Sequence, residues 1–276
     1  MGEENIIFGI NPILEALRAD RFFERIYVAK GRKGKPIEEI LALARSRGIE
    51  VRFEPRERIE QMARRFVEES LLRRGDGESI PRSPHRPVAA SQIVTQGVLG
   101  ITSPYRYLAL EELWEEVRGK KEPPFLVVLD GVEDPHNLGA ILRSAEGAGA
   151  HGIILPKRRS AALTPTVAKA AAGALEYISV CRVSNLASTL ERLKEYGLWI
   201  YGTVPGAGEI YYTVDLKGPL ALVIGGESEG LKELTSKKCD FLLSIPLCGK
   251  IASLNASVAA AILMYEVRRQ RGIKLG

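Results

Sequence analysis

The sequence contains few cysteines, and none of them belongs to a metal-binding or redox motif. Its 276 residues include 3 cysteines, at positions 181, 239 and 248, and no C-x-x-C pair. We therefore expect neither a disulfide framework nor a metal site, and the cysteine usage fits a reducing, cytoplasmic compartment. A targeting leader is not expected either, because Glu3 and Glu4 stand where a signal or transit peptide carries positive charge. No apolar run reaches the roughly 18 residues of a membrane-spanning helix, so no membrane partner is expected.

Two common nucleotide-binding motifs are missing as well. No G-x-G-x-x-G follows the first strand of the C-terminal half, and no G-x-x-x-x-G-K-[ST] occurs. A dinucleotide or nucleoside triphosphate site is therefore poorly supported. The glycines at 225 and 226 instead allow the backbone to approach a ligand that need not carry a phosphate.

What the chain does have is an excess of positive charge and ample apolar material. The formal net charge is +5, and 45% of the residues are hydrophobic. The hydrophobic share is sufficient for a sizeable core. The charge allows an RNA or DNA partner without requiring one, since many basic proteins bind neither.

The pattern of apolar residues divides the chain into two α/β domains joined by a linker. In residues 1–103, short apolar strands alternate with helices, the first of which Asn11 is expected to cap ahead of Pro12. Residues 104–122 are the expected linker, and residues 123–276 are the second domain. There, near-continuous apolar runs alternate with helical segments, which indicates a parallel sheet covered on both faces. The expected strands of that sheet are 125–129, 152–155, 199–203, 220–224 and 241–245.

Three polar loops follow strands of the second domain. In an open parallel sheet, ligands bind at the carboxyl ends of the strands, where such loops meet. The candidate functional side chains in and just after these loops are Asn137, Arg143, Glu227, Ser253 and Asn255.

Each candidate also has a purely structural explanation. Asn137 is suited to a helix N-cap, and Ser253 and Asn255 are suited to capping the last helix. Arg143 is compatible with a solvated helix surface, and Glu227 with a solvated turn. The occurrence of three such loops in one domain favours the functional interpretation.

Three segments carry a resemblance to a known family. They are LDGVEDPHNLGAILRSAEGAGAHGIILP (Leu129–Pro156), LALVIGGESEGL (Leu220–Leu231) and IPLCGKIASLNASVAAAILMYE (Ile245–Glu266). With these motifs in this order, residues 125–272 resemble the SpoU (TrmH-like) family of RNA 2′-O-ribose methyltransferases of the SPOUT class. FGINPILEALR near the N-terminus and TQGVLGI (Thr95–Ile101) resemble the family's L30e-like RNA-binding domain. The chain is most similar to the branch that methylates a guanosine of large-subunit ribosomal RNA.

The resemblance implies S-adenosylmethionine as methyl donor, a deep trefoil knot formed by the C-terminal segment, and a homodimer with its active site near the subunit interface. By motif position, it assigns the catalytic group to Asn137, Arg143, Glu227, Ser253 and Asn255. The cofactor site is assigned in the same way to Gly225, Ile245 and Leu254, and Thr203 is expected to join them because it ends the preceding strand. Two roles stay open for the arginine. It is either the acceptor of the ribose proton or, because a guanidinium stays protonated, a charge that binds phosphate or stabilises the developing alkoxide.

RNA affinity is expected from the N-terminal domain. Its basic turn holds Arg32, Lys33 and Lys35. A second basic series lies between residues 64 and 86, where acids partly offset it and a glycine- and proline-rich loop is expected. The family often has His-Gln-Gly where this chain has Thr95-Gln96-Gly97, a departure that concerns the RNA contacts rather than the methyl-transfer core.

The resemblance leaves two rival functions. A tRNA 2′-O-methyltransferase is the alternative within the same class, and a non-catalytic RNA-binding or ribosome-assembly module is the alternative of another class. The complete set of five candidate catalytic residues argues against the second alternative, because a pure binding protein has no need of them.

Overall fold

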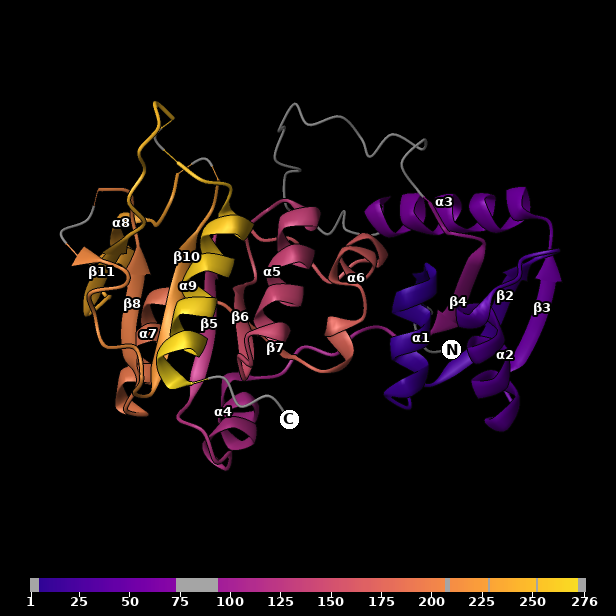
Figure 1. The fold of residues 1–276 in the computed structure, drawn as a ribbon, viewed down its shortest axis with the longest axis horizontal. Coiled ribbons are helices and arrows are strands. Elements are labelled where there is room, and N and C mark those ends of the chain that lie inside the picture. The colour runs from indigo at the N-terminus through magenta and orange to yellow at the C-terminus, as the bar shows by residue number, and fades with distance from the viewer. Residues whose placement is uncertain (1–4, 73–93, 207–208, 228, 252, 273–276) are drawn as a thin grey trace. The chain divides into compact units, whose positions relative to one another are not determined.

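The computed structural model describes residues 5–72, 94–206, 209–227, 229–251 and 253–272, and the chain divides into two compact units, Met1–Tyr105 and Arg106–Gly276 (Figure 1). The loop expected within residues 75–86 lies outside the described residues. Much of the expected linker belongs to the second unit, because it contains helix α4 (Leu110–Arg118). Leu113 and Val117 on this helix are fully buried in the core of that unit.

The N-terminal unit is a mixed four-stranded sheet with helices on both faces. Its strand order is β1-β4-β2-β3, in which β4 runs antiparallel to both of its neighbours and β2 and β3 are parallel. Helices α1 and α2 share one hydrophobic cluster with the sheet, and α3 shares another. The elements are β1 (Asn5–Phe8), α1 (Ile10–Arg18), β2 (Phe23–Ala29), α2 (Lys35–Ser46), β3 (Glu50–Glu54), α3 (Arg56–Leu72) and β4 (Val98–Thr102).

Helix α1 begins earlier than the sequence predicts, so the expected capping role of Asn11 is wrong. The residue before the helix is Gly9, and Ile10 is the first helical residue. Gln96 takes over the capping function from outside the helix, since its Oε1 accepts a hydrogen bond from the Ile10 N–H at 2.8 Å. Pro12 still lies within the first turn, where its missing N–H costs nothing.

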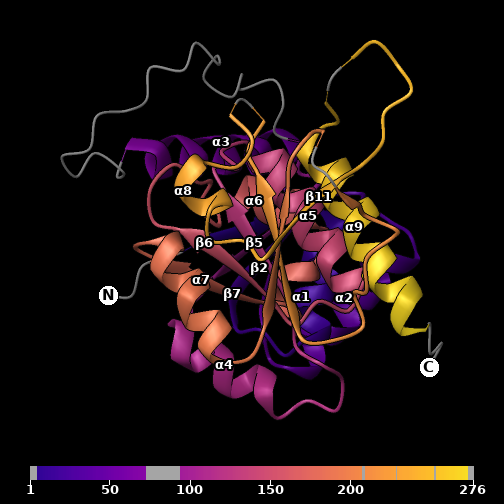
Figure 2. The same cartoon turned by 90° about the vertical axis from the view of Figure 1, so that its left-hand side faces the viewer.

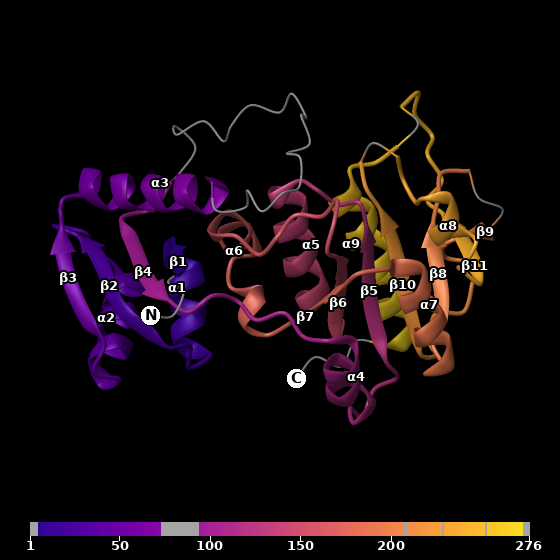
Figure 3. The same cartoon turned by 180° about the vertical axis from the view of Figure 1, so that it is seen from behind.

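The C-terminal unit is a seven-stranded sheet in the order β7-β6-β5-β10-β8-β11-β9, and every pairing in it is parallel. Helices α5 and α9 cover one face, whereas α4 and α7 cover the other, as Figures 2 and 3 show. The strands are β5 (Phe125–Asp130), β6 (Gly152–Pro156), β7 (Ser179–Val183), β8 (Trp199–Thr203), β9 (Glu209–Ile210), β10 (Leu220–Gly225) and β11 (Phe241–Ser244). The helices that follow α4 are α5 (Pro135–Gly147), α6 (Pro165–Ala171), the 3-10 turn η2 (Ala174–Glu176), α7 (Leu186–Glu195), α8 (Glu233–Ser236) and α9 (Ala256–Arg271).

The expected parallel sheet is confirmed, with two further strands at its edges. Strand β7 is one edge, and Ser179 and Arg182 interrupt the apolar run by which the interior strands are recognised. Strand β9, at the other edge, has two residues, too few for any periodicity. Edge strands need less apolar sequence because one side has no strand neighbour.

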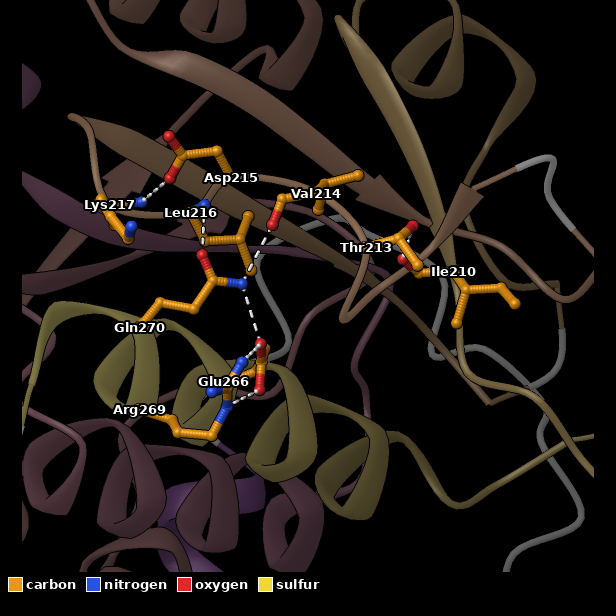
Figure 4. Close-up of polar contacts among 9 residues, drawn as sticks. All are labelled: Ile210, Thr213, Val214, Asp215, Leu216, Lys217, Glu266, Arg269 and Gln270. Carbon is orange, nitrogen blue, oxygen red and sulfur yellow. Dashed lines mark hydrogen bonds and ion pairs between the residues drawn. The ribbon is translucent and has the colours of Figure 1, made fainter.

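Side-chain hydrogen bonds hold the last helix against the loop that precedes β10 (Figure 4). The Gln270 amide donates to the Val214 carbonyl at 2.9 Å and accepts from the Leu216 N–H at 2.8 Å. Glu266, which is buried, accepts from Gln270 at 2.8 Å and from Arg269 at 2.7 Å. These contacts tie the end of α9 to a loop more than 50 residues earlier in the chain.

Candidate functional site

The three polar loops expected to meet do so at one edge of the C-terminal sheet. They follow β5, β10 and β11, which all run in the same direction, so their carboxyl ends lie at the same edge. The first loop leads into α5, the second into α8 and the third into α9. This arrangement brings residues more than 100 positions apart in the sequence into contact.

A chain of side-chain hydrogen bonds joins the three loops. The Asn137 Nδ2 donates to Glu227 Oε1. In turn, the Asn255 Nδ2 donates to the Asn137 Oδ1 at 3.0 Å. Each amide therefore uses its donor end toward one neighbour and its acceptor end toward another, which fixes the orientation of both groups. Glu227 ends the chain as the only carboxylate in it.

The structure separates the capping and functional interpretations of the two asparagines. Asp134 caps α5, because its carboxylate accepts from the His136 N–H at 2.6 Å, so Asn137 is not the N-cap. Asn255 does cap α9, and its Oδ1 accepts from the Ser257 N–H at 2.9 Å. Its Nδ2 is left to bond Asn137, so one side chain both caps the helix and joins two of the loops.

Arg143 and Ser253 are exposed near this edge and outside the hydrogen-bond chain. Arg143 is six residues beyond Asn137 on α5, which corresponds to about 9 Å along the helix axis. Within the described part of the chain, no hydrogen bond or ion pair engages either side chain. Both are therefore available to an external group.

The paired glycines after β10 are required by the protein's own backbone. A Cβ atom on Gly225 would lie 2.2 Å from the carbonyl carbon of Gly230, and one on Gly226 would lie 2.1 Å from the carbonyl oxygen of Gly131. Neither distance is tolerable for a side chain. Packing of the β10 loop against itself and against the β5 loop thus accounts for both glycines without a ligand.

Three of the four expected cofactor residues come from the ends of neighbouring strands, and the fourth, Leu254, lies in the loop before α9. Thr203 pairs with Leu243 of β11, and its hydroxyl donates to the Val223 carbonyl of β10 at 3.1 Å. Gly225 ends β10, and Ile245 directly follows β11. These residues therefore lie along a single stretch of the carboxyl edge.

The loop between β11 and α9 exposes apolar side chains beside that edge. Leu247 and Leu254 are each 39% exposed, and Ile251 is 78% exposed. Exposed apolar groups that share a loop with polar ones are typical of a ligand-binding surface.

An ion pair behind the β10 loop, in which the carboxylate is buried and the lysine is partly exposed, was not among the sequence-based candidates. Asp130, at the end of β5, is 1% exposed, and its carboxylate lies 3.0 Å from the Lys232 ammonium. An acidic residue ending an otherwise apolar strand is the signal in the sequence that points to it. The partner, 102 positions away, has no such signal.

The basic turn of the N-terminal unit lies at the carboxyl end of β2, before α2. Lys30, Arg32, Lys33 and Lys35 are exposed, and none is ion-paired with a residue in the described ranges. Several arginines elsewhere on this unit have acidic partners: Arg18 pairs with Glu15 and Glu39, and both Arg25 and Arg52 pair with Glu50. The turn is thus a local concentration of uncompensated positive charge.

The described residues form neither a metal centre nor a membrane-spanning helix. They contain no group of three or more His, Cys, Asp or Glu side chains placed to hold a metal ion. None of their helices is both long and apolar enough to cross a membrane. The thiols of Cys181 and Cys239 are poor nucleophiles, because burial raises the pKa of each to about 12.

Two family models together match most of the chain. The model of the SpoU rRNA methylase family matches residues 124–265, and a model for RNA 2′-O ribose methyltransferase substrate binding matches residues 6–69. The chain is 41% identical over 269 residues to YacO of Bacillus subtilis (strain 168), named a TrmH family tRNA/rRNA methyltransferase, and covers 97% of that relative and 98% of itself.

Two solved structures extend this likeness to the fold. An AdoMet-bound rRNA methyltransferase from Sinorhizobium meliloti superposes with a TM-score of 0.69 at 25% identity, over 96% of this chain and 87% of that chain. A crystal structure of an RNA 2′-O ribose methyltransferase does so with a TM-score of 0.69 at 26% identity, over 97% of this chain and 89% of the other. The three joined loops thus lie in the region that the methylase model matches, and the chain belongs to the SpoU rRNA methylase family.

Proposed function

We propose that the protein transfers a methyl group from S-adenosylmethionine to a ribose 2′-hydroxyl of RNA. The observation that carries the proposal is the hydrogen-bond chain Glu227–Asn137–Asn255, which joins three loops at the ligand-binding edge of the sheet. Two solved structures support the same activity, since one is an AdoMet-bound rRNA methyltransferase and the other is an RNA 2′-O ribose methyltransferase.

The stretch formed by Thr203, Gly225, Ile245 and Leu254 fits an S-adenosylmethionine site. Its apolar side chains, including the partly exposed Leu254, suit an adenine ring. When bound there, the cofactor supplies an electrophilic methyl group on a sulfonium. The protein's own contribution is to hold the ribose in line with that group, and orientation alone is worth several kcal/mol.

Arg143 acts as a fixed positive charge in this proposal. Its guanidinium is exposed and has no acidic partner among the described residues, so it is free to bind a phosphate or the oxygen that develops negative charge. A group that stays protonated is a poor proton acceptor. The ribose proton therefore passes to another group or to water. Asn137, Glu227 and Asn255 hold the three loops of the site in position.

The substrate that we propose is a guanosine of large-subunit ribosomal RNA. The solved rRNA methyltransferase resembles this chain over both units, and residues 6–69 match the substrate-binding model. The unpaired cations Arg32, Lys33 and Lys35 are the proposed contacts to RNA phosphates. Modification of tRNA is the alternative, and the name of the Bacillus subtilis relative includes both substrates.

A homodimer is part of the proposal. Helix α9 packs against α5 and β10, and it exposes Val258 at 46% and Tyr265 at 51%. Apolar side chains along an otherwise packed helix are suited to burial against a second copy. The trefoil knot and the cytoplasmic location that the sequence suggests stay predictions.

The direct test is methylation of total RNA with a labelled methyl donor, followed by mapping of alkali-resistant ribose positions. We expect label at a guanosine of large-subunit rRNA. Label in tRNA alone would overturn the choice of substrate, and no label in any RNA would overturn the proposed activity.

Asn137→Ala is the variant that tests the assigned site. It removes both hydrogen bonds of the central amide, so we expect turnover to fall about 100-fold while S-adenosylmethionine affinity stays close to that of the wild type. Calorimetry measures the affinity. Near-normal turnover in this variant would contradict the assignment.

A further inference from the structure

Asp130 is a buried carboxylate at the end of an otherwise apolar strand, and the proposed reaction assigns it no role. It is 1% exposed, and a buried charge is costly unless it is paired and hydrogen-bonded. We infer that Asp130 and Lys232 are positioning residues, which hold the loop after β10 so that Glu227 meets Asn137. The inference rests on the proposed function, since Glu227 and Asn137 are assigned by it.

Asp130 holds both ends of the loop. At the start, the Gly226 N–H donates to the Asp130 carbonyl at 2.8 Å. At the end, the Lys232 N–H donates to Oδ2 at 3.1 Å, and the Lys232 ammonium lies 3.0 Å from Oδ1. One residue of β5 thereby closes the loop between Gly226 and Lys232, and Glu227 is the first side chain inside it.

Two further contacts hold the described part of the loop close to itself and to the backbone after β5. Gly230 donates its N–H to the Gly226 carbonyl at 3.1 Å, so the two glycines bridge across the turn. The Cβ position of Gly226 faces the Gly131 carbonyl oxygen at 2.1 Å, so the loop lies directly on the backbone that leads to Asn137. A shift of either end of the loop therefore moves Glu227 away from the Asn137 amide, whose hydrogen bond it accepts.

The charges explain why the lysine matters more than an ordinary surface cation. Among the described residues, Lys232 is the one cation within ion-pair distance of the Asp130 carboxylate. Removing it leaves a buried negative charge without compensation. Hydration would then stabilise the carboxylate, which favours entry of water between β5 and the loop. Asp130 lies behind the loop rather than at its exposed face, so its effect on the reaction passes through Glu227.

Lys232→Met tests the inference, because it keeps the length of the side chain and removes the charge. We expect kcat for RNA methylation to fall about 10- to 100-fold, since a small displacement of a catalytic group has that effect. The KM for RNA and the affinity for S-adenosylmethionine should stay within about threefold of the wild type, because neither depends on Glu227. Lys232→Arg, which keeps the charge, should recover most of the lost kcat.

Lys237→Met is the matched control, because Lys237 also pairs with a carboxylate, Glu233, but on the exposed surface of α8. It should leave kcat unchanged, since an exposed pair contributes little. Lys232→Gln replaces Lys232→Met in the same measurements where the methionine variant does not fold. A kcat equal to that of Lys237→Met in whichever Lys232 variant folds would overturn the inference.

A double-mutant cycle with Glu227→Ala, which removes the acceptor for Asn137, separates positioning from a general loss of stability. If Lys232 acts through Glu227, Lys232→Met should cost less than about twofold in kcat once Glu227 is already replaced. An undiminished loss in that background would overturn the inference. A wild-type protein that methylates no RNA would instead overturn the proposed function, so the two failures are distinguishable.

Discussion

Asn255 meets two demands with one amide group. Its Oδ1 caps α9, and its Nδ2 donates to Asn137 at 3.0 Å. An aspartate at this position keeps the capping acceptor and loses the donor. We therefore expect Asn255→Asp to unfold at the wild-type temperature while its turnover falls at least tenfold, about 1.4 kcal/mol in the barrier.

Two alanine variants complete this comparison. Asn255→Ala loses both functions and should be about 1 kcal/mol less stable as well as inactive. Asn185→Ala removes a side chain that only caps α7, by accepting from the Ser188 N–H at 3.2 Å, so it should lose similar stability and keep its turnover. Thermal unfolding and methylation assays measure both quantities. Full activity in Asn255→Asp would mean that the bond to Asn137 is structural.

At the residue scale, the sequence identifies candidate site residues more readily than it identifies the residues that they contact. Asn137, Glu227 and Asn255 were identifiable because each is a polar group in a loop at the end of an apolar strand, and the structure joins them. Lys232 was not, because its importance comes from Asp130, a residue 102 positions away. The close approach of Gly226 to Gly131 is hidden from the sequence for the same reason.

Hydrogen bonds connect the end of helix α9 to the segments just before two central strands. The Arg271 guanidinium donates to the Pro123 carbonyl at 2.7 Å and to the Gly218 carbonyl at 2.6 Å, just before β5 and β10. Nearby, the His151 Nδ1 accepts from the Phe125 N–H at 3.0 Å. That bond requires a neutral ring, because a protonated imidazole has no acceptor.

This arrangement makes the stability of the C-terminal unit sensitive to acid. Burial and the charges of Lys120 and Arg271 lower the pKa of His151 to about 4, against an ordinary value of 6.5. Between these values the unfolded chain binds a proton that the folded chain does not, so the free energy of unfolding decreases as the pH falls from 6.5 to 4. We expect a decrease of about 1 kcal/mol from this group, less than the full shift implies because the ring is partly exposed.

Denaturant unfolding of the wild type and of His151→Asn, each at several pH values, measures this contribution. The asparagine offers an acceptor to the Phe125 N–H but does not titrate, so its stability should change less across the interval. Identical pH profiles for the two proteins would show that His151 does not contribute.

Elements were predictable where their sequences are periodic or uniformly apolar. The five interior strands of the parallel sheet were expected from buried runs such as Phe125–Asp130. The edge strands β7 and β9 were not, because one contains polar residues and the other has two residues. The start of α1 was misplaced because its cap comes from Gln96, which the local sequence around Gly9 does not reveal.

At the scale of the whole molecule, the distribution of charge matters more than the net value of +5. Many basic side chains of the N-terminal unit are neutralised by acids, whereas Arg32, Lys33 and Lys35 have no ion-pair partner among the described residues. The sequence identified this turn from its composition alone. Only the structure distinguishes it from equally basic but compensated positions such as Arg25 and Arg52.

That difference yields a measurable prediction for RNA binding. Each cation that contacts a phosphate of single-stranded RNA contributes about 0.7 to the slope of log affinity against log salt. Replacing Arg32, Lys33 and Lys35 by Gln should therefore flatten the slope by about 2 and weaken RNA binding at low salt. S-adenosylmethionine affinity should not change, because these residues belong to the other unit.

A control triple variant removes the same charge from compensated positions. Replacing Arg18, Arg25 and Arg52 by Gln lowers the net charge equally, but each of these arginines is already paired with a glutamate. If local, unpaired charge binds the phosphates, the control should keep most of the wild-type slope. Equal slopes in the two triple variants would mean that net charge alone attracts RNA, and the basic turn would then lose its status as a contact surface.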